Sequence, residues 1–161
     1  MKLLKTINFL LALSLLQFMA CTTAQEPEHN NQLKHKEANT ENLFNHIKNG
    51  KFLKVSTMVA NGADLTITDA DGKTPLILAA ELGKYAMISI FLEKIAGIDA
   101  KDFAGKTALM YACENGHSHT VEVLLNKGKA DKSLTDNSAK TALEYAKENG
   151  DSNTLEVIEK N

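Results

Sequence analysis

The sequence predicts an all-α protein with short β-turns or hairpins, a solenoid of about four helix-turn-helix units whose outer two units act as caps. The first reason is a tandem repeat: residues 102–117, DFAGKTALMYACENGH, match residues 69–84 after a shift of 33 positions and residues 136–151 after a shift of 34. A period of this length is typical of a repeat array. The second reason is that apolar residues within each unit follow helical spacing. Because helices this short are marginal alone in water, each unit must stack on the next.

The first 24 residues have the character of a secretory signal peptide, and the alternative is an uncleaved N-terminal anchor helix. Two lysines precede an apolar run over residues 7–20, which is short for a membrane span. Two processing sites stay open. Small residues suit cleavage after Ala24, which we favour, whereas Ala20-Cys21 is similar to a bacterial lipobox, in which Cys21 would become a lipidated first residue. We therefore expect export to the periplasm, with a lipid at Cys21 as the only membrane contact.

Residues 25–40 are expected to form a flexible linker before the array. They are polar, include a proline and contain too few apolar side chains to offset the entropy of ordering. His29 and His35 are interpreted as solvated linker residues rather than as metal ligands. The array is expected over residues 41–161. Its units are predicted at about residues 41–68, 69–101, 102–135 and 136–161.

Each full unit is expected to open at an aspartate in a hairpin and to continue into a helix capped by threonine. Thr74 can cap its helix, and Pro75 suits the first helical turn. Gly83 can adopt the positive φ that ends this helix, and a second, antiparallel helix follows. The same columns recur along the chain at Asp69, Asp102 and Asp136, at Thr74, Thr107 and Thr141, and at Gly50, Gly83, Gly116 and Gly150.

These residues resemble the ankyrin repeat family. The family pattern D-x-x-G-x-T-P-L-H-x-A-A-x-x-G is matched from Asp69 to Gly83 and less fully from Asp102 to Gly116. The resemblance implies a slightly curved stack of hairpin–helix–helix units that binds other proteins through one concave face. The family's histidine is replaced in this chain by Ile77, Met110 and Glu144.

Departures from the family pattern predict where the array ends and where it is irregular. In the last unit Glu144 and Lys147 place charges at positions that are usually packed, which suits a terminal cap with a wet outer face. The first unit lacks the Thr-Pro core and is interpreted as the N-terminal cap. Ile95 stands where the family has a glycine, which predicts an altered loop, and Lys129 is interpreted as a one-residue insertion.

The residues of chemical interest are interpreted as structural, so we expect no enzyme activity, no cofactor and no metal. Cys113 occupies a small-residue packing position and should behave as a buried hydrophobe. His117 follows a glycine, where the family commonly has histidine, and is expected to be scaffolding. His119 and His46 lie in different units and do not make a ligand set. All 18 basic residues are lysine and the net charge is -2, which argues against nucleic-acid binding.

The resemblance places a protein-binding face on the hairpin tips and the exposed positions of the first helices. Phe103 is an aromatic residue at a tip, and two readings stay open: an anchor for a partner, or a side chain folded onto its own hairpin. The lysine column at the helix starts either forms a positive row or is a solvated face. The predicted contact residues are Asp71, Lys73, Leu82, Phe103, Lys106, Glu114, Asn115, Lys140, Glu148 and Asn149.

We therefore expect a monomeric, non-enzymatic protein-interaction module in the bacterial cell envelope, with an unidentified protein as its partner. Such a module could assist an envelope enzyme or neutralise a toxin. One alternative is a secreted effector that binds a host protein. The other is a metal- or cofactor-binding protein or enzyme that uses the histidines with Cys113.

Overall fold

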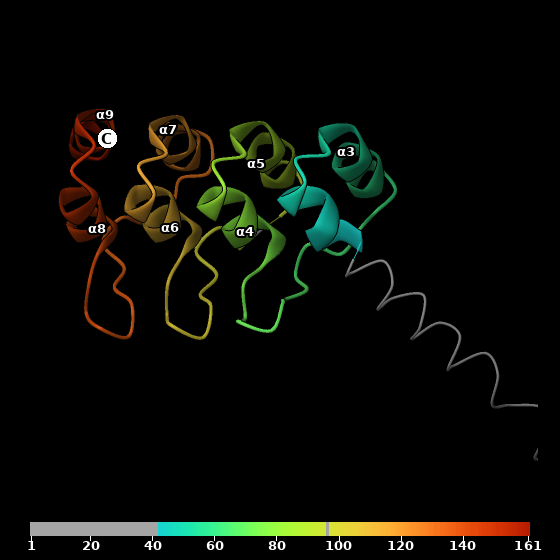
Figure 1. Ribbon diagram of the computed structural model, residues 1–161, viewed down its shortest axis with the longest axis horizontal. Helices are drawn as coiled ribbons and strands as arrows, with labels where there is room; N and C mark the ends of the chain where they lie inside the picture. The colour runs from blue at the N-terminus through green and yellow to red at the C-terminus, as the bar shows by residue number, and fades with distance from the viewer. Residues whose placement is uncertain (1–41, 96) are drawn as a thin grey trace, which may run out of the picture. The chain divides into compact units, whose positions relative to one another are not determined.

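The computed structural model describes residues 42–95 and 97–161, so the predictions of a signal peptide and a linker lie outside the described residues. Within them the chain forms eight helices in consecutive pairs and no strand. Figure 1 shows the pairs side by side, with the first helix of each pair in one layer and the second helix in another. The predicted all-α repeat solenoid is confirmed.

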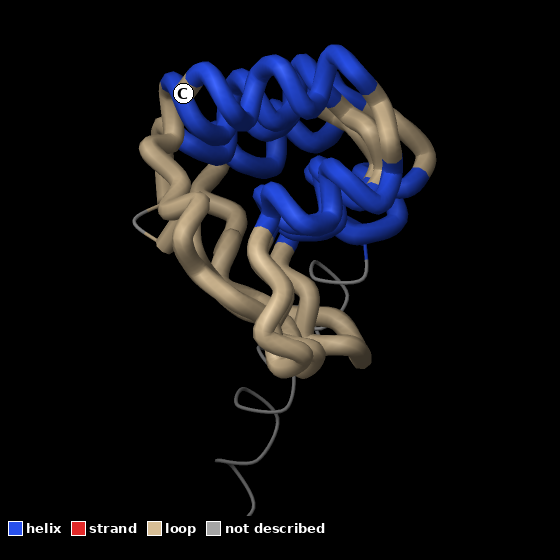
Figure 2. Tube along the Cα trace, turned by 90° about the vertical axis from the view of Figure 1, so that its left-hand side faces the viewer, coloured by secondary structure: helices blue, strands red, loops and turns tan. Residues whose placement is uncertain are grey.

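Each unit contributes one helix to the inner layer and one to the outer layer. The bounds are 42–48 and α3 Phe52–Ala60, α4 Pro75–Glu81 and α5 Tyr85–Leu92, α6 Ala108–Glu114 and α7 Ser118–Asn126, and α8 Ala142–Asn149 and α9 Ser152–Lys160. Helices α4, α6 and α8 pack in the inner layer, and α3, α5, α7 and α9 pack in the outer layer. Figure 2 shows the loops extending from the helices toward one side, where the hairpins before α4, α6 and α8 lie together.

Threonine caps begin α4, α6 and α8, as predicted. Thr74 Oγ1 accepts a hydrogen bond from the Ile77 backbone N–H at 3.3 Å, and the same bond recurs at α6 and α8. At α8 the Glu144 carboxylate also accepts from the Thr141 backbone N–H at 2.6 Å, which completes a capping box. This bond lowers the pKa of Glu144, and the negative charge suits a helix N-terminus.

The core runs through both layers without a break from Leu43 to Ile158. Small residues fill the inner layer, so that neighbouring helices approach closely; the fully buried ones are Ala79, Ala80, Ala108, Ala112, Cys113 and Ala146. Larger apolar side chains fill the space toward the outer layer. Stability therefore depends on contacts between successive units, because no helix pair has a core of its own.

The irregular positions have separate physical causes. Lys129, the predicted insertion, has a φ of 59°, so the extra residue is accommodated by a left-handed turn. Gly128 is required for packing, because a Cβ there would collide with the Ile98 side chain and the Leu124 carbonyl. Ile95 is half-buried against the core, and its N–H donates to the Phe91 carbonyl at 3.0 Å. At the far end Glu144 and Lys147 are exposed, as expected for a cap.

Candidate binding face

Each hairpin tip is shaped by the aspartate that opens it. Asp102 Oδ1 accepts hydrogen bonds from the backbone N–H groups of Ala104, at 3.0 Å, and Lys106, at 2.8 Å. Asp69 and Asp136 make the same pair of bonds in the neighbouring hairpins. Such side chain-to-backbone bonds satisfy turn N–H groups that have no helical partner. The tips are therefore ordered loops with a common geometry.

Neighbouring tips are also joined to one another. The Phe103 N–H donates to the Asp71 carbonyl at 3.2 Å, and the Asn137 N–H donates to the Ala104 carbonyl at 3.1 Å. The Asn137 side chain adds a bond from Nδ2 to the Phe103 carbonyl at 3.0 Å. We call residues 70–71, 103–104 and 137–138 the tip row. These bonds hold the tip row in one register along the array.

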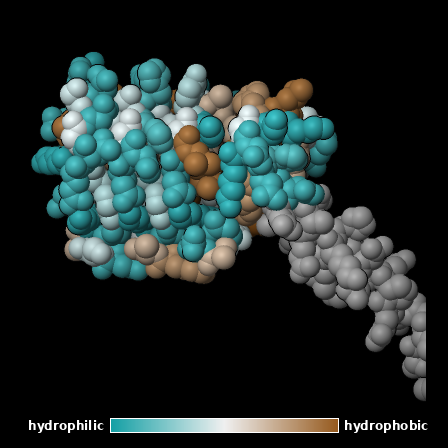
Figure 3. Space-filling model, in the orientation of Figure 1, coloured by the Kyte–Doolittle hydropathy of each residue, from teal (hydrophilic) through white to brown (hydrophobic). Residues whose placement is uncertain are grey.

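Phe103 is the large apolar residue of the tip row, and it is 75% exposed. It lies against the preceding hairpin, because a Cβ at Gly72 would come within 2.7 Å of the ring. The ring therefore does not fold onto its own hairpin, and its role as an anchor for a partner stays a prediction. Figure 3 shows moderately hydrophobic surface along part of the lower edge, where the hairpin ends lie, and hydrophilic surface at the end of this edge nearest α8.

The inner helices carry a second set of predicted contact residues, and here each lysine is paired with a glutamate. Lys73 Nζ lies 2.7 Å from Glu81 Oε1, and Lys106 Nζ lies 2.8 Å from Glu114 Oε1. The third pair, Lys140 and Glu148, is closed at 2.6 Å. Lys73 and Lys106 are largely covered, with side-chain exposures of 14% and 15%. The interpretation of this column as a positive row is wrong, because each ammonium group is neutralised.

Two tyrosines that the sequence reasoning missed lie between the lysines. Lys73 Nζ is 4.5 Å and Lys106 Nζ is 5.0 Å from the centre of the Tyr111 ring. Lys106 and Lys140 flank Tyr145 in the same way, at 4.3 and 5.4 Å. Cations at this distance from an aromatic face are attracted by its quadrupole. We call this alternation of lysine and tyrosine, with its three glutamates, the inner-helix strip. The signal was present as a column, since the two tyrosines are 34 residues apart.

The tyrosine hydroxyls tie the inner-helix strip to the hairpins. Tyr111 donates to Asp102 Oδ2 at 2.7 Å, and Tyr145 donates to Asp136 Oδ2 at 2.7 Å. Burial and the hydrogen bond to Asp102 raise the pKa of Tyr111 far above its usual value, and the same causes raise the pKa of Tyr145 to about 12. Both hydroxyls stay neutral donors over the physiological range.

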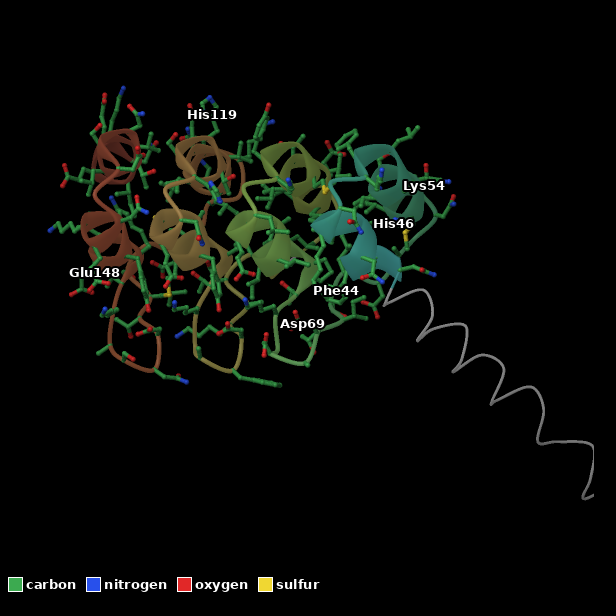
Figure 4. All side chains as sticks on the ribbon, in the orientation of Figure 1. Phe44, His46, Lys54, Asp69, His119 and Glu148 are labelled. Carbon is green, nitrogen blue, oxygen red and sulfur yellow. The ribbon has the colours of Figure 1, made fainter. Side chains whose placement is uncertain are left out.

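The remaining predicted contact residues divide into exposed side chains and side chains that hold units together. Leu82 ends α4 and is 36% exposed. Asn149 Nδ2 donates to the Glu114 carbonyl at 3.0 Å, so it bridges the last two units, and Asn115 Nδ2 donates to the Tyr111 carbonyl at 2.9 Å. Figure 4 shows Glu148 on α8 and Asp69 in the hairpin before α4, on the two sets of elements that make up the face.

The residues considered for chemistry have structural surroundings. Cys113 is fully buried, and burial raises the pKa of its thiol to about 12, which is unsuited to a nucleophile. His117 Nε2 lies 3.0 Å from the Glu81 carbonyl, and its ring packs over Gly83, as the scaffolding interpretation predicts. The His119 ring lies beside the Tyr85 ring in a tilted arrangement, with a centroid separation of 5.9 Å. In the described part of the chain no group of three metal-ligating side chains comes together.

The fold and this face define a class: a helical repeat scaffold whose side chains are organised for contact with other proteins. The family model of ankyrin repeats in three copies matches residues 43–136 and again residues 95–160. The chain belongs to the ankyrin repeat family. A comparison with curated proteins finds none that matches the chain. Over residues 42–95 and 97–161, no helix is long and apolar enough to cross a membrane.

Proposed function

We propose that this protein is a non-enzymatic interaction module of the bacterial cell envelope, which binds one partner protein through the tip row and the exposed edge of the inner-helix strip. The observation that carries the proposal is the exposure of Phe103 at an ordered tip. Members of a repeat family that share a scaffold differ in what they bind by the residues that they display on it.

The tip row offers an anchor that needs little rearrangement on binding. Its backbone is fixed by Asp69, Asp102 and Asp136 and by the bonds between neighbouring tips. Ordering a loop on binding costs free energy, so a loop that is already ordered retains more of the contact energy as affinity. The exposed Phe103 ring stands among polar residues such as Asp71 and Asn137, the arrangement of an aromatic anchor with a polar rim.

The inner-helix strip would contribute acidic character to the contact. In each of its pairs the glutamate is more exposed than the lysine: 29% against 14%, 39% against 15%, and 57% against 39%. A partner that approaches this strip meets carboxylates before it meets ammonium groups. Electrostatic complementarity of this kind sets orientation and association rate more than affinity.

Capture of a partner from an envelope extract tests the face. Phe103→Asp should abolish capture and Phe103→Ala should weaken it by about tenfold or more, as expected for an aromatic anchor. Asn153→Asp is the matched control, because it adds the same charge at an exposed position of α9, outside the face. Equal capture by Phe103→Asp and the parent protein would show that the partner binds elsewhere.

The location is tested separately by the mass of the mature protein and by cell fractionation. The signal-like start of the sequence supports export. A mature chain that begins at Gln25 would establish the soluble periplasmic form, and a diacylated Cys21 would establish the lipoprotein. Recovery from the culture medium without cell lysis would instead favour a secreted effector. Within the envelope, an assisted enzyme and a neutralised toxin would be distinguished by the identity of the captured protein.

A further inference from the structure

The charge of the array is divided unevenly along the stack. Residues 42–63, which include the helix 42–48 and α3, contain three lysines and no acidic residue. Residues 64–161 contain 11 lysines and 16 acidic residues. Residues 42–63 therefore carry a net charge of +3 and residues 64–161 a net charge of −5; over the whole first unit, residues 41–68, Glu41 and Asp64 reduce the charge to +1. The positive charge at this end of the array favours the approach of anionic partners.

The basic end of the array also exposes apolar side chains. Phe52 and Leu53, the first two residues of α3, are 43% and 77% exposed, and they lie between the exposed lysines Lys51 and Lys54. In the described residues neither lysine forms an ion pair with an acid, unlike the three lysines of the inner-helix strip. Figure 4 shows Lys54 at the α3 edge of the array, directed away from the other units.

The second unit extends this surface. Helices α3 and α5 pack together, and a Cβ at Gly50 would lie 3.8 Å from Lys84 Nζ. The next residue, Tyr85, is 52% exposed at the start of α5. We call this set the basic cap patch; it consists of Lys51, Phe52, Leu53, Lys54, Lys84 and Tyr85.

The basic cap patch is confined to one end of the array. The positions of Lys51 and Phe52 are occupied by Lys84 and Tyr85 in the second unit, but by His117 and Ser118 in the third and Asp151 and Ser152 in the fourth. The outer-helix starts therefore change from basic and apolar to polar and acidic along the stack. Figure 3 shows strongly hydrophobic surface at the α3 edge, with hydrophilic surface beside it.

We propose that the basic cap patch binds the surface of an anionic lipid membrane. Aromatic and leucine side chains partition into the interface while lysines bind acidic headgroups, and a site that joins both without an acidic residue matches that surface. The sequence supports this occupant, since only residues 22–41 separate Cys21, the candidate lipidation site, from this end of the array. The proposal rests on the envelope location proposed above, because the protein must meet a membrane in the cell. Its test uses purified protein and does not depend on that location.

In this arrangement the array would lie with its first unit on the membrane and its remaining units toward solvent. The tip row and the basic cap patch use different residues, so partner binding and lipid binding can occur together. A lipid on Cys21 would add a second, weak attachment, and two weak attachments together hold a protein far more firmly than either alone.

Binding to lipid vesicles tests the proposal with the protein that begins at Gln25, which carries neither a lipid nor the apolar N-terminal segment and retains the whole described core. We expect it to cosediment with phosphatidylcholine vesicles that contain phosphatidylglycerol, and about tenfold more weakly or worse with phosphatidylcholine alone. High salt should release it, because the lysine contacts are screened. Lys51→Glu with Lys54→Glu should weaken binding by more than tenfold, at roughly fivefold per lost lysine.

Two controls separate the patch from general charge and from folding. Lys147→Glu with Lys160→Glu makes the same charge change at exposed positions near the other end and should leave vesicle binding within about twofold. Leu53→Ser changes no charge and should weaken binding by about threefold or more. Equal losses from the two pairs of lysines, or no vesicle binding at all, would overturn the proposal. A different outcome would also overturn it: no vesicle binding, together with a concentration-dependent dimer that the substitutions Lys51→Glu and Lys54→Glu abolish. The patch would then bind a second copy of the chain. Equal capture of the partner by Phe103→Asp and the parent protein, which would overturn the proposed binding face, would leave this result unchanged.

Discussion

Asp102 and Phe103 are neighbours in the chain, yet one is buried in a hydrogen-bond network and the other is exposed to solvent. Asp102 is 7% exposed, and its carboxylate accepts hydrogen bonds from two backbone N–H groups and the Tyr111 hydroxyl. Phe103 is 75% exposed and contacts the neighbouring tip with one side of its ring. The first residue recurs in each full unit as Asp69 and Asp136, whereas the position of Phe103 holds Ala70 and Asn137 in the other units.

This difference separates residues that build the repeat array from residues that are available to bind a partner. Columns that recur along the chain build the stack, and positions that vary from unit to unit decide what the surface binds. The lysine and glutamate columns also recur, and each pair closes across its own unit and flanks a tyrosine, so they leave only the exposed edge of the glutamates for contact with a partner. Of the predicted contact residues, Phe103, Asp71 and Leu82 therefore have the strongest claim to recognition.

The largest expected difference in the free energy of unfolding is between two single variants, Asp102→Ala and Phe103→Ala. Asp102→Ala removes three hydrogen bonds from a buried carboxylate and leaves the Tyr111 hydroxyl without its acceptor, so it should lower the free energy of unfolding by about 3 kcal/mol. Phe103→Ala should lower it by about 0.5 kcal/mol or less, because most of the ring is already in water. Urea denaturation followed by circular dichroism measures both.

Asp69→Ala is the matched control for the buried carboxylate. Asp69 makes the same two backbone bonds as Asp102, but Leu78 occupies the position of Tyr111, so the tyrosine bond is missing. Its loss should cost about 1 kcal/mol less than the loss of Asp102. Equal costs would show that the tyrosine bond adds nothing and that the two hairpins differ only in their tips.

The tyrosine bonds also predict how stability changes in alkali. Burial and the bond to Asp136 favour the neutral form of Tyr145 and raise its pKa in the folded protein from the usual 10.0 to about 12. The contribution of the hydroxyl is therefore complete below pH 10, where the unfolded chain begins to titrate, and is lost as the pH rises through the folded pKa. The free energy of unfolding should fall over this window, and Tyr145→Phe, which removes the titrating group, should show a smaller fall. An equal fall in the variant would assign the effect to other groups.

Much of the fold was predictable from sequence because the period, the threonine caps and the aspartate turns are local signals that repeat. The position of the Phe103 ring was not predictable, because it depends on the space that Gly72 leaves in the preceding unit. The inner-helix strip was missed for a similar reason. Lys73 and Glu81 are eight residues apart in the chain, and the Tyr111 ring that Lys73 flanks comes from the next unit. Contacts between units decide which side chains of the face remain exposed, and a single unit does not contain them.

A smaller effect is expected at the tip of the last hairpin, where a recurring column is broken. Ala139 stands at the position of Gly72 and Gly105 and has a φ of 62°, a left-handed conformation that disfavours a side chain. Ala139→Gly should relieve this strain and raise the free energy of unfolding by about 1 kcal/mol, partly offset by the entropy of the added glycine. Gly105→Ala should do the reverse and more, because its Cβ would come within 2.5 Å of Asn137 Oδ1. Thermal melting measures both, and a stabilising Gly105→Ala would contradict the assignment of strain.

The smallest expected effect on stability tests whether the inner-helix strip stabilises the array, contacts the partner, or does both. Lys106→Met keeps the aliphatic chain between Tyr111 and Tyr145 but removes the charge that pairs with Glu114. Because the pair is only partly covered, the free energy of unfolding should fall by about 1 kcal/mol or less, and the loss should shrink as salt is added. Binding of the partner should change more than stability, since Glu114 would then face the partner with its charge unpaired. If Lys106→Met destabilised the array as strongly as Asp102→Ala, the strip would be a structural element alone, and recognition would rest on the varying residues of the tips.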